Sequence, residues 1–102
     1  LADVCTALAD PTRRAILDRV GRGPCTTGEL AALFPTTRFA VMKHIGVLER
    51  AGLLVSTRRG RERWNHLNAV PLVRLVERWI SPLAERGARS LLALARHVES
   101  ED

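Results

Sequence analysis

The sequence contains little of what marks secreted, membrane or disulfide-bonded proteins. Its 102 residues include only two cysteines, Cys5 and Cys25, and their wide spacing favours reduced buried thiols over a disulfide. No run of about 18 apolar residues is present, so no segment is predicted to cross a membrane. Because no signal-peptide pattern opens the chain either, we expect a cytoplasmic protein.

The sequence also lacks the patterns that enzymes use. It has no pair of carboxylates, no nucleophile beside a base, no phosphate-binding glycine loop and no cluster of metal ligands, so we expect neither an enzyme nor a cofactor or metal site. Its length corresponds to one domain over residues 1–102. A chain this short buries only about two-thirds of the surface that its unfolded state exposes, so a core shared with a second copy would add stability.

The positive charge of the chain is confined to one segment. The formal net charge is +5 at pH 7, and residues 36–66 alone hold seven basic and two acidic side chains. The basic ones are Arg38, Lys43, Arg50, Arg58, Arg59, Arg61 and Arg63. The other 71 residues hold nine of each sign, so the entire excess lies in this segment. A surface that meets phosphate groups needs such segregation, whereas a merely solvated face does not.

Capping residues predict three helices in the first third of the chain. Residues 1–8 form the first, and Asp10 followed by Pro11 is typical of the start of the second. Thr26 or Thr27 caps the third. The residues expected to face inward in the second and third helices are Ile16, Leu17, Val20, Leu30 and Leu33.

The rest of the chain predicts a longer helix, a hairpin and a last helical region. The helix covers residues 37–51 and ends at Gly52, and the hairpin covers residues 53–67. The last helical region covers residues 70–98. This order predicts a mainly α fold with a small β-hairpin, namely a winged helix-turn-helix with about five helices and a two-stranded wing.

The helix over residues 37–51 has two unlike faces. The residues on its core face are Ala40, Val41, His44, Val47 and Leu48. The opposite face places Phe39 and Met42 among charged residues, which is unusual for a solvated surface. Because arginine reads guanine edges and apolar groups contact thymine methyls, this face is predicted to enter the major groove of DNA. The alternatives are that Phe39 and Met42 pack on a neighbouring element, and that His44 either lies in the core or donates to a phosphate.

The hairpin over residues 53–67 is predicted to be the wing. Gly60 is free to adopt the positive φ of a tight turn. Four arginines, Arg58, Arg59, Arg61 and Arg63, crowd its tip and return strand. Because they interrupt an otherwise apolar strand pair beside a helix-turn-helix, we predict that they contact DNA.

Two apolar stripes follow the hairpin and predict a homodimer. They lie over residues 72–80 and 83–98, and Ser81-Pro82 separates them either as a kink or as a new cap. Left unpaired, they would expose a larger apolar patch than monomers usually tolerate. Together with residues 1–8 they predict an interface formed by Val4, Leu8, Leu72, Leu75, Val76, Trp79, Ile80, Leu83, Gly87, Leu91 and Leu94.

Three segments in the right order resemble the ArsR family of bacterial repressors. They are ALADPTRRAIL at 7–17, TRFAVMKHIGVLERAGLL at 37–54 and RRGRERWNHLN at 58–68, and the resemblance covers roughly residues 4–80. It implies a winged-helix dimer, joined through its first and last helices, that represses by binding double-stranded DNA at an operator with two-fold symmetry. By position it implies base or groove contacts at Arg38, Phe39, Met42 and Lys43, and phosphate contacts at Thr36, Thr37 and the wing arginines.

The sequence departs from the metal-sensing members that it resembles. Those members carry Cys-x-Cys before an Asp-Leu on the third helix, where this chain has Thr26 and Gly28 before Glu29-Leu30. Its last helix has His97 without the paired ligands of zinc-sensing members, and a competent site needs three or four ligands. We therefore expect a regulator that does not respond to metal. Met42 stands where members often have Ser, so no operator preference is carried over.

Two other functions compete with DNA binding by a repressor. A winged helix can serve as a protein-interaction module, although the segregated arginines argue against that use. A thiol-based redox sensor would use Cys5 or Cys25, if residues 1–8 pack near the start of the third helix. A salt-dependent shift of DNA would separate the first alternative from a repressor.

Overall fold

Residues 2–100 are described by the computed structural model, which divides the chain into two compact units, Leu1–Leu72 and Val73–Asp102. We call them the N-terminal unit and the C-terminal unit. The N-terminal unit contains the predicted helix-turn-helix and the wing, and the C-terminal unit is helical. With the continuous helical run 70–100 counted as one, the described residues hold five helices, which confirms the predicted fold class.

The first two helices, α1 (Ala2–Leu8) and α2 (Pro11–Val20), meet at a capped corner. The Asp10 carboxylate accepts hydrogen bonds from the backbone N–H groups of Thr12 at 2.8 Å and Arg13 at 3.1 Å, and Pro11 occupies the first helical position. This is the predicted cap. Chiefly because the N–H of Arg13 stabilises the charged carboxylate, the pKa of Asp10 lies below its usual value.

The helix-turn-helix consists of α3 (Thr27–Ala32) and α4 (Arg38–Arg50). Each begins at a threonine whose hydroxyl accepts from a backbone N–H of the first turn, Thr26 from Glu29 and Thr37 from Ala40, both at 3.1 Å. Beyond the end of α4, Gly52 adopts a φ of +77°, the left-handed conformation that stops a helix.

The wing belongs to a three-stranded antiparallel sheet rather than to an isolated hairpin. Strands β2 (Leu54–Arg59) and β3 (Glu62–Leu67) are joined by a tight turn in which Gly60 has a φ of +63°. The short strand β1 (Cys25–Thr26) pairs with the other side of β3, so the order is β1-β3-β2. The two-stranded description was therefore incomplete, because a two-residue strand leaves no periodic signal in the sequence.

Asn65 fastens the sheet to the helix-turn-helix. It is fully buried in β3, opposite Cys25 of β1. Its amide nitrogen donates to the Cys25 carbonyl at 3.2 Å and to the Thr27 hydroxyl at 3.1 Å. These bonds fix the base of the wing to the start of α3.

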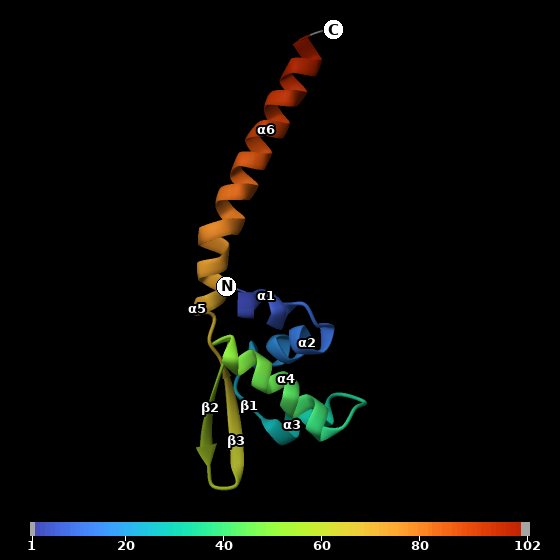
Figure 1. The fold of residues 1–102 in the computed structure, drawn as a ribbon, viewed down its shortest axis with the longest axis vertical. Helices are drawn as coiled ribbons and strands as arrows, with labels where there is room; N and C mark the ends of the chain where they lie inside the picture. Colours follow the sequence, from blue (N-terminus) through green and yellow to red (C-terminus); the bar gives the residue numbers. More distant parts are fainter. Residues whose placement is uncertain (1, 101–102) are drawn as a thin grey trace. The chain divides into compact units, whose positions relative to one another are not determined.

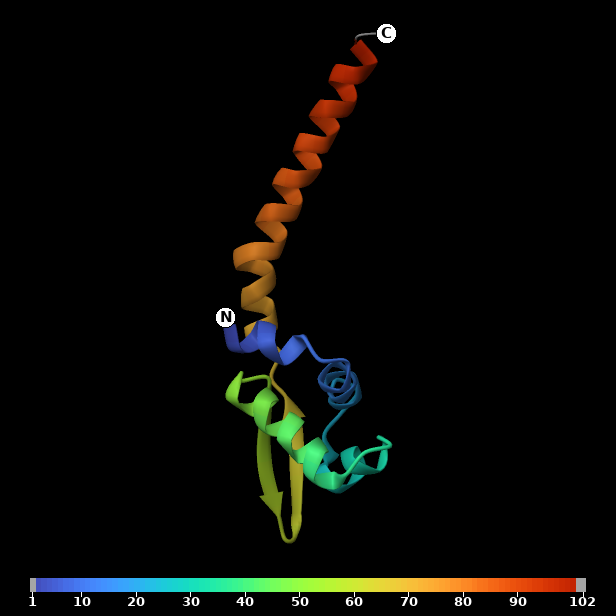
Figure 2. The ribbon, with the colours of Figure 1, turned by 45° about the vertical axis from the view of Figure 1, so that its right-hand side comes forward.

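The core of the N-terminal unit lies between α2, α3, α4 and the base of the sheet. The residues that are almost or wholly buried there include Ile16, Leu30, Val41, Ile45, Leu48 and Leu53. Leu33 is 56% exposed, so its predicted inward orientation is wrong. The reason is that α3 ends at Ala32, which leaves Leu33 at the cap beyond its last turn. Both ribbon views show α1 and α2 on one side of α4 and the hairpin tip reaching beyond the helices (Figures 1 and 2).

The C-terminal unit continues a helix without interruption at Ser81-Pro82. The segment α5 (Val70–Leu75) runs into a π-helical turn, Val76–Ile80, and then into α6 (Ser81–Ser100). Proline has no N–H and its ring crowds the preceding turn, so the wider π-turn lets the helix pass Pro82. Neither of the two predicted alternatives, a kink or a new cap, describes this π-helical turn. Among the described residues, no helix is both long and apolar enough to cross a membrane.

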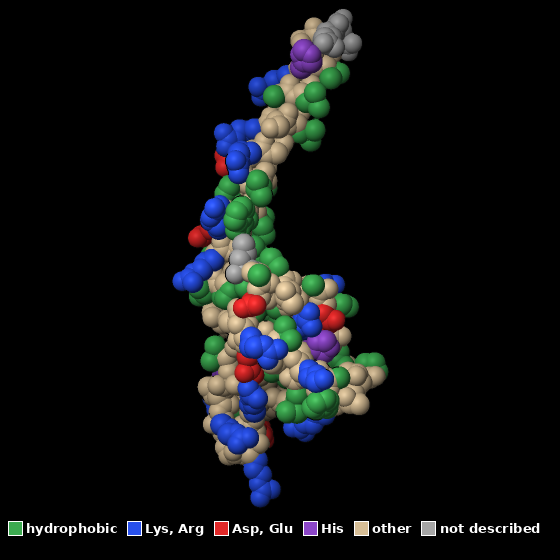
Figure 3. Space-filling model, viewed as in Figure 1, with side chains coloured by type: hydrophobic (Ala, Val, Ile, Leu, Met, Phe, Trp, Pro, Cys, Tyr) green, Lys and Arg blue, Asp and Glu red, His purple; other side chains and the backbone are tan. Residues whose placement is uncertain are grey.

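One side of α6 is apolar along its length. None of its residues is buried, and the space-filling view shows hydrophobic side chains along one edge and basic ones along the other (Figure 3). Leu83, Leu91 and Leu94 are 53%, 68% and 58% exposed. In contrast, Val4 of α1 is only 6% exposed because it packs inside the N-terminal unit, which leaves it little surface to offer a second copy.

Candidate nucleic-acid interface

The outward face of α4 combines exposed apolar and basic side chains. Phe39 is 67% and Met42 is 46% exposed, so within the described chain neither is covered by a neighbouring element. The Lys43 ammonium lies 4.8 Å from the centroid of the Phe39 ring, which holds the two side chains together by a cation–π contact. Arg38 is exposed at the first position of the helix. The predicted core face of α4 holds only in part. Val41 and Leu48 are buried as predicted, and Ile45, which was not predicted, is buried with them. Val47, predicted on the core face, instead lines a surface hollow together with Phe39 and Met42.

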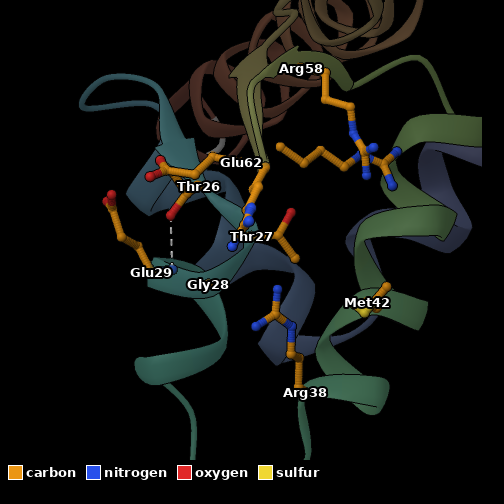
Figure 4. Close-up of a pocket in the computed structure, with 10 residues that line it drawn as sticks. Thr26, Thr27, Gly28, Glu29, Arg38, Met42, Arg58 and Glu62 are labelled. Carbon is orange, nitrogen blue, oxygen red and sulfur yellow. Dashed lines mark hydrogen bonds between the residues drawn. The ribbon is translucent and has the colours of Figure 1, made fainter.

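An open groove separates the start of α4 from the wing. Its volume is about 540 Å³. The residues that line it are Thr26, Thr27, Gly28, Glu29, Arg38, Met42, Arg58, Arg61, Glu62 and Arg63. In the close-up, Arg38 reaches into the groove from α4, and Arg58 comes from the wing above it (Figure 4). Four guanidinium groups thus surround a space that contains two carboxylates.

The arginines around this groove differ in how they are held. Arg63 donates to the Glu49 carboxylate of α4 at 2.5 Å, so it fastens the wing to the helix. Within residues 2–100, Arg38, Arg58 and Arg61 form no ion pair. A cation without a protein partner is available to a phosphate, and these three are therefore the candidates for contacts with a nucleic acid.

Arg59 lies on the other face of the wing. Its guanidinium carbon is 5.6 Å from the centroid of the Trp64 ring, close enough for a cation–π contact. Arg59 follows Arg58 in β2, and it does not line the groove. The wing thus presents cations on both of its faces.

Of the predicted site residues at the turn before α4 and on its inner side, Thr37 and His44 have structural partners. Thr36 is exposed, and the exposed Thr37 uses its hydroxyl to cap α4. His44 lies on the side of α4 that faces α1 and α2, with Nδ1 3.2 Å from Arg13 Nη1 and 3.9 Å from the Asp10 carboxylate. The structure therefore does not bring His44 to the outward face with Phe39 and Met42.

The two cysteines lie in different surroundings. Both are free thiols, Cys5 exposed and Cys25 fully buried. Burial raises the pKa of the Cys25 thiol, and its hydrogen bond to the Glu29 carboxylate at 3.5 Å adds to this effect. A raised pKa removes the reactive thiolate, so Cys25 is a poor redox sensor. Among residues 2–100, no group of three or more His, Cys, Asp or Glu side chains could hold a metal ion.

Sequence reasoning missed part of the groove wall. Gly28 and Glu29 belong to it because β1 pairs with β3 and brings the start of α3 beside the wing. The cap sequence Thr26-Thr27 predicted where α3 begins, but nothing local indicated its neighbour. The turn, the outward helix face and the basic wing together define the class of winged helix-turn-helix DNA-binding proteins.

Comparisons of sequence identify the family more closely. A family model described as a helix-turn-helix domain matches residues 8–57. The HTH-type transcriptional regulator Rv2034 of Mycobacterium tuberculosis is 38% identical over 95 residues, which cover 93% of this chain and 85% of that protein. The transcriptional repressor SdpR of Bacillus subtilis is 29% identical over 89 residues, which cover 87% of this chain and 98% of that protein.

Comparison of structure agrees. The crystal structure of an ArsR family transcriptional regulator matches with a TM-score of 0.78 at 39% sequence identity. The match covers 85% of this chain and 89% of that one. The protein belongs to the ArsR family of helix-turn-helix transcriptional regulators, which confirms the resemblance predicted from its three segments and its prediction as a non-enzyme.

Proposed function

We propose that the protein is a homodimeric repressor that binds a specific double-stranded DNA operator. The observation that carries the proposal is the convergence of Arg38, Arg58 and Arg61, none of them ion-paired within residues 2–100, beside the exposed Phe39 and Met42 of α4. Unpaired cations bind phosphates, and a helix face with both basic and apolar side chains can contact base edges and thymine methyls.

The groove beside α4 fits the way in which DNA presents its two grooves. An α-helix of about 10–12 Å diameter fills the major groove, which is about 12 Å wide. A sugar-phosphate backbone separates that groove from the adjacent minor groove. If α4 enters the major groove and the wing tip meets the minor groove, this backbone runs along the 540 Å³ groove between them. Arg58 and Arg61 would meet it from the wing, whereas Arg38, at the start of α4, would reach base edges of the major groove.

The apolar side of α6 supports a dimer as the active form. Leu83, Leu91 and Leu94 are more than half exposed, and burying such leucines contributes about 1.5–3 kcal/mol each. A second copy of the same helix offers a matching apolar side, as two-fold interfaces require. Two copies present two α4 helices, which fit two half-sites of an operator with two-fold symmetry.

Repression is the regulatory outcome that we propose. The similarity to SdpR, a protein named as a repressor, supports it. A dimer that covers an operator within a promoter excludes the transcription machinery from the same DNA. The site of action would then be the cytoplasm of a bacterium, where its chromosome lies.

The test starts from an operator selected from random duplexes with the purified protein. We expect Arg38→Ala to weaken operator binding more than binding to random DNA, because an arginine–guanine contact contributes about 1–3 kcal/mol of discrimination. Arg22→Ala is the control, since Arg22 is exposed in the turn after α2 and does not line the groove. Fluorescence anisotropy with both duplexes measures the ratio. An equal loss of affinity for the two DNAs would show that Arg38 does not read bases. Failure of the unaltered protein to bind DNA in a salt-dependent way would overturn the proposed function.

A further inference from the structure

The inner side of α4 is held by an arginine that the DNA-binding face does not use. Arg13 belongs to α2, and all three nitrogens of its guanidinium are engaged. Nε donates to the Ala7 carbonyl at 2.9 Å and Nη2 donates to the Thr6 carbonyl at 2.7 Å, both at the end of α1. Nη1 lies 3.2 Å from His44 Nδ1, in the middle of α4. One side chain therefore joins three helices.

The chemistry of this contact determines the state of the histidine. A guanidinium has only donors, so the nitrogen of His44 that faces it must accept. The proton of the neutral imidazole is then on Nε2. Because the ring is half-buried and its Nδ1 is engaged, it resists a rotation of α4 about its own axis.

Because His44 resists rotation of α4, its position affects the DNA-binding face of that helix. His44 lies on the opposite side of α4 from Phe39 and Met42, at the middle of a 13-residue helix. Contacts with base edges depend on where a recognition helix points, and small displacements weaken several of them together. A side chain that fixes the inner face of α4 therefore also sets the direction of its outer face.

We propose that Arg13 is a positioning residue for DNA recognition, which couples the end of α1 to the recognition helix through His44. The inference rests on the proposed function of α4. It assigns no contact with DNA to Arg13. It also implies that α1 affects DNA binding, because any change in the position of its last turn is transmitted to α4 through the Arg13 guanidinium.

The neighbouring Arg14 supplies a matched control. It follows Arg13 in α2 and also donates to the end of α1, from Nη1 to the Leu8 carbonyl at 2.7 Å. Within residues 2–100, its side chain forms no hydrogen bond or ion pair with α4. Replacing either arginine by alanine removes one positive charge and its bonds to α1, but only Arg13→Ala also removes the link to His44.

The test compares Arg13→Ala, Arg14→Ala and His44→Leu in binding to the selected operator across a salt series. We expect Arg13→Ala and His44→Leu each to lower operator affinity about tenfold (about 1.4 kcal/mol), with Arg14→Ala close to the unaltered protein. The double variant Arg13→Ala/His44→Leu should be no weaker than the worse single variant, because both remove the same link. The salt slope should not change, since no phosphate contact is lost.

A spectroscopic signature separates positioning from general loosening. In ¹⁵N NMR, the His44 Nδ1 resonance should shift in Arg13→Ala and stay in place in Arg14→Ala. If Arg13→Ala does not fold, His44→Leu decides, because it keeps the bonds of Arg13 to α1 and removes, besides the link, only the 3.9 Å contact of His44 with the Asp10 carboxylate. Equal affinities for the Arg13 and Arg14 variants, additive losses in the double variant, or a smaller salt slope would each overturn the proposal. If the unaltered protein bound no DNA, the proposed function would fail first, and that result is distinct from these.

Discussion

Replacing Leu91 by glutamate should convert the protein into a monomer and lower its affinity for a two-fold operator by about a hundredfold or more. Leu91 lies on the apolar side of α6 and is 68% exposed in the single chain. In the proposed dimer a second copy covers this side, and a buried unpaired carboxylate is strongly unfavourable there. The loss of affinity follows because two linked recognition helices bind one operator with an effective concentration that a single helix lacks.

A control two residues away tests whether the position or the charge is responsible. Ala93→Glu adds the same negative charge to α6, but on the opposite side of the helix. This variant should remain a dimer and should bind the operator with unchanged affinity. Light scattering at micromolar concentration gives the mass, and anisotropy gives the affinity. A dimeric Leu91→Glu would show that α6 does not form the interface, and a monomeric unaltered protein would rule out the dimer itself.

Much of the fold was predictable because its signals are local. The caps at Asp10 and Thr37 each need only a side-chain oxygen and N–H groups two or three residues later. The positive φ values at Gly52 and Gly60 occur where the sequence placed a helix end and a tight turn. Such features depend on neighbours in the chain, so one sequence was sufficient to predict them.

The features that could not be predicted depend on contacts between distant residues. The strand β1 exists because Cys25 pairs with Asn65 of β3, 40 positions away, and the Asn65 side chain also donates to the Cys25 carbonyl. The wing arginines look alike in sequence, yet Arg63 is paired with Glu49 while Arg58 and Arg61 form no ion pair within residues 2–100. Residue type predicted that the wing is basic, but only the register of the sheet distinguishes an arginine that holds the wing from one that is available to DNA.

This distinction leads to the prediction with the largest expected effect. Neutralising both available wing arginines, in the double variant Arg58→Gln/Arg61→Gln, should weaken binding to the operator and to random DNA alike. If each arginine neutralises one phosphate, a dimer loses four phosphate contacts. The log–log salt slope should then fall by about 3 to 4, and affinity at 0.15 M salt should fall by about a thousandfold. Glutamine keeps most of the side chain, so the wing itself should stay folded.

Two comparisons make that result specific to the groove. Arg22→Gln/Arg74→Gln removes the same charge from exposed arginines that do not line it, and should change the slope by much less. Glu49→Gln instead removes the charged partner of Arg63 and leaves that cation available to a phosphate, so it should raise the salt slope rather than lower it. Titrations of both duplexes from 0.05 to 0.3 M salt, about the range over which phosphate contacts dominate, measure all three variants.

If the control double variant lost as much slope as Arg58→Gln/Arg61→Gln, the effect would belong to the net charge of the protein. An unchanged slope for Arg58→Gln/Arg61→Gln would mean that the DNA backbone does not pass between α4 and the wing.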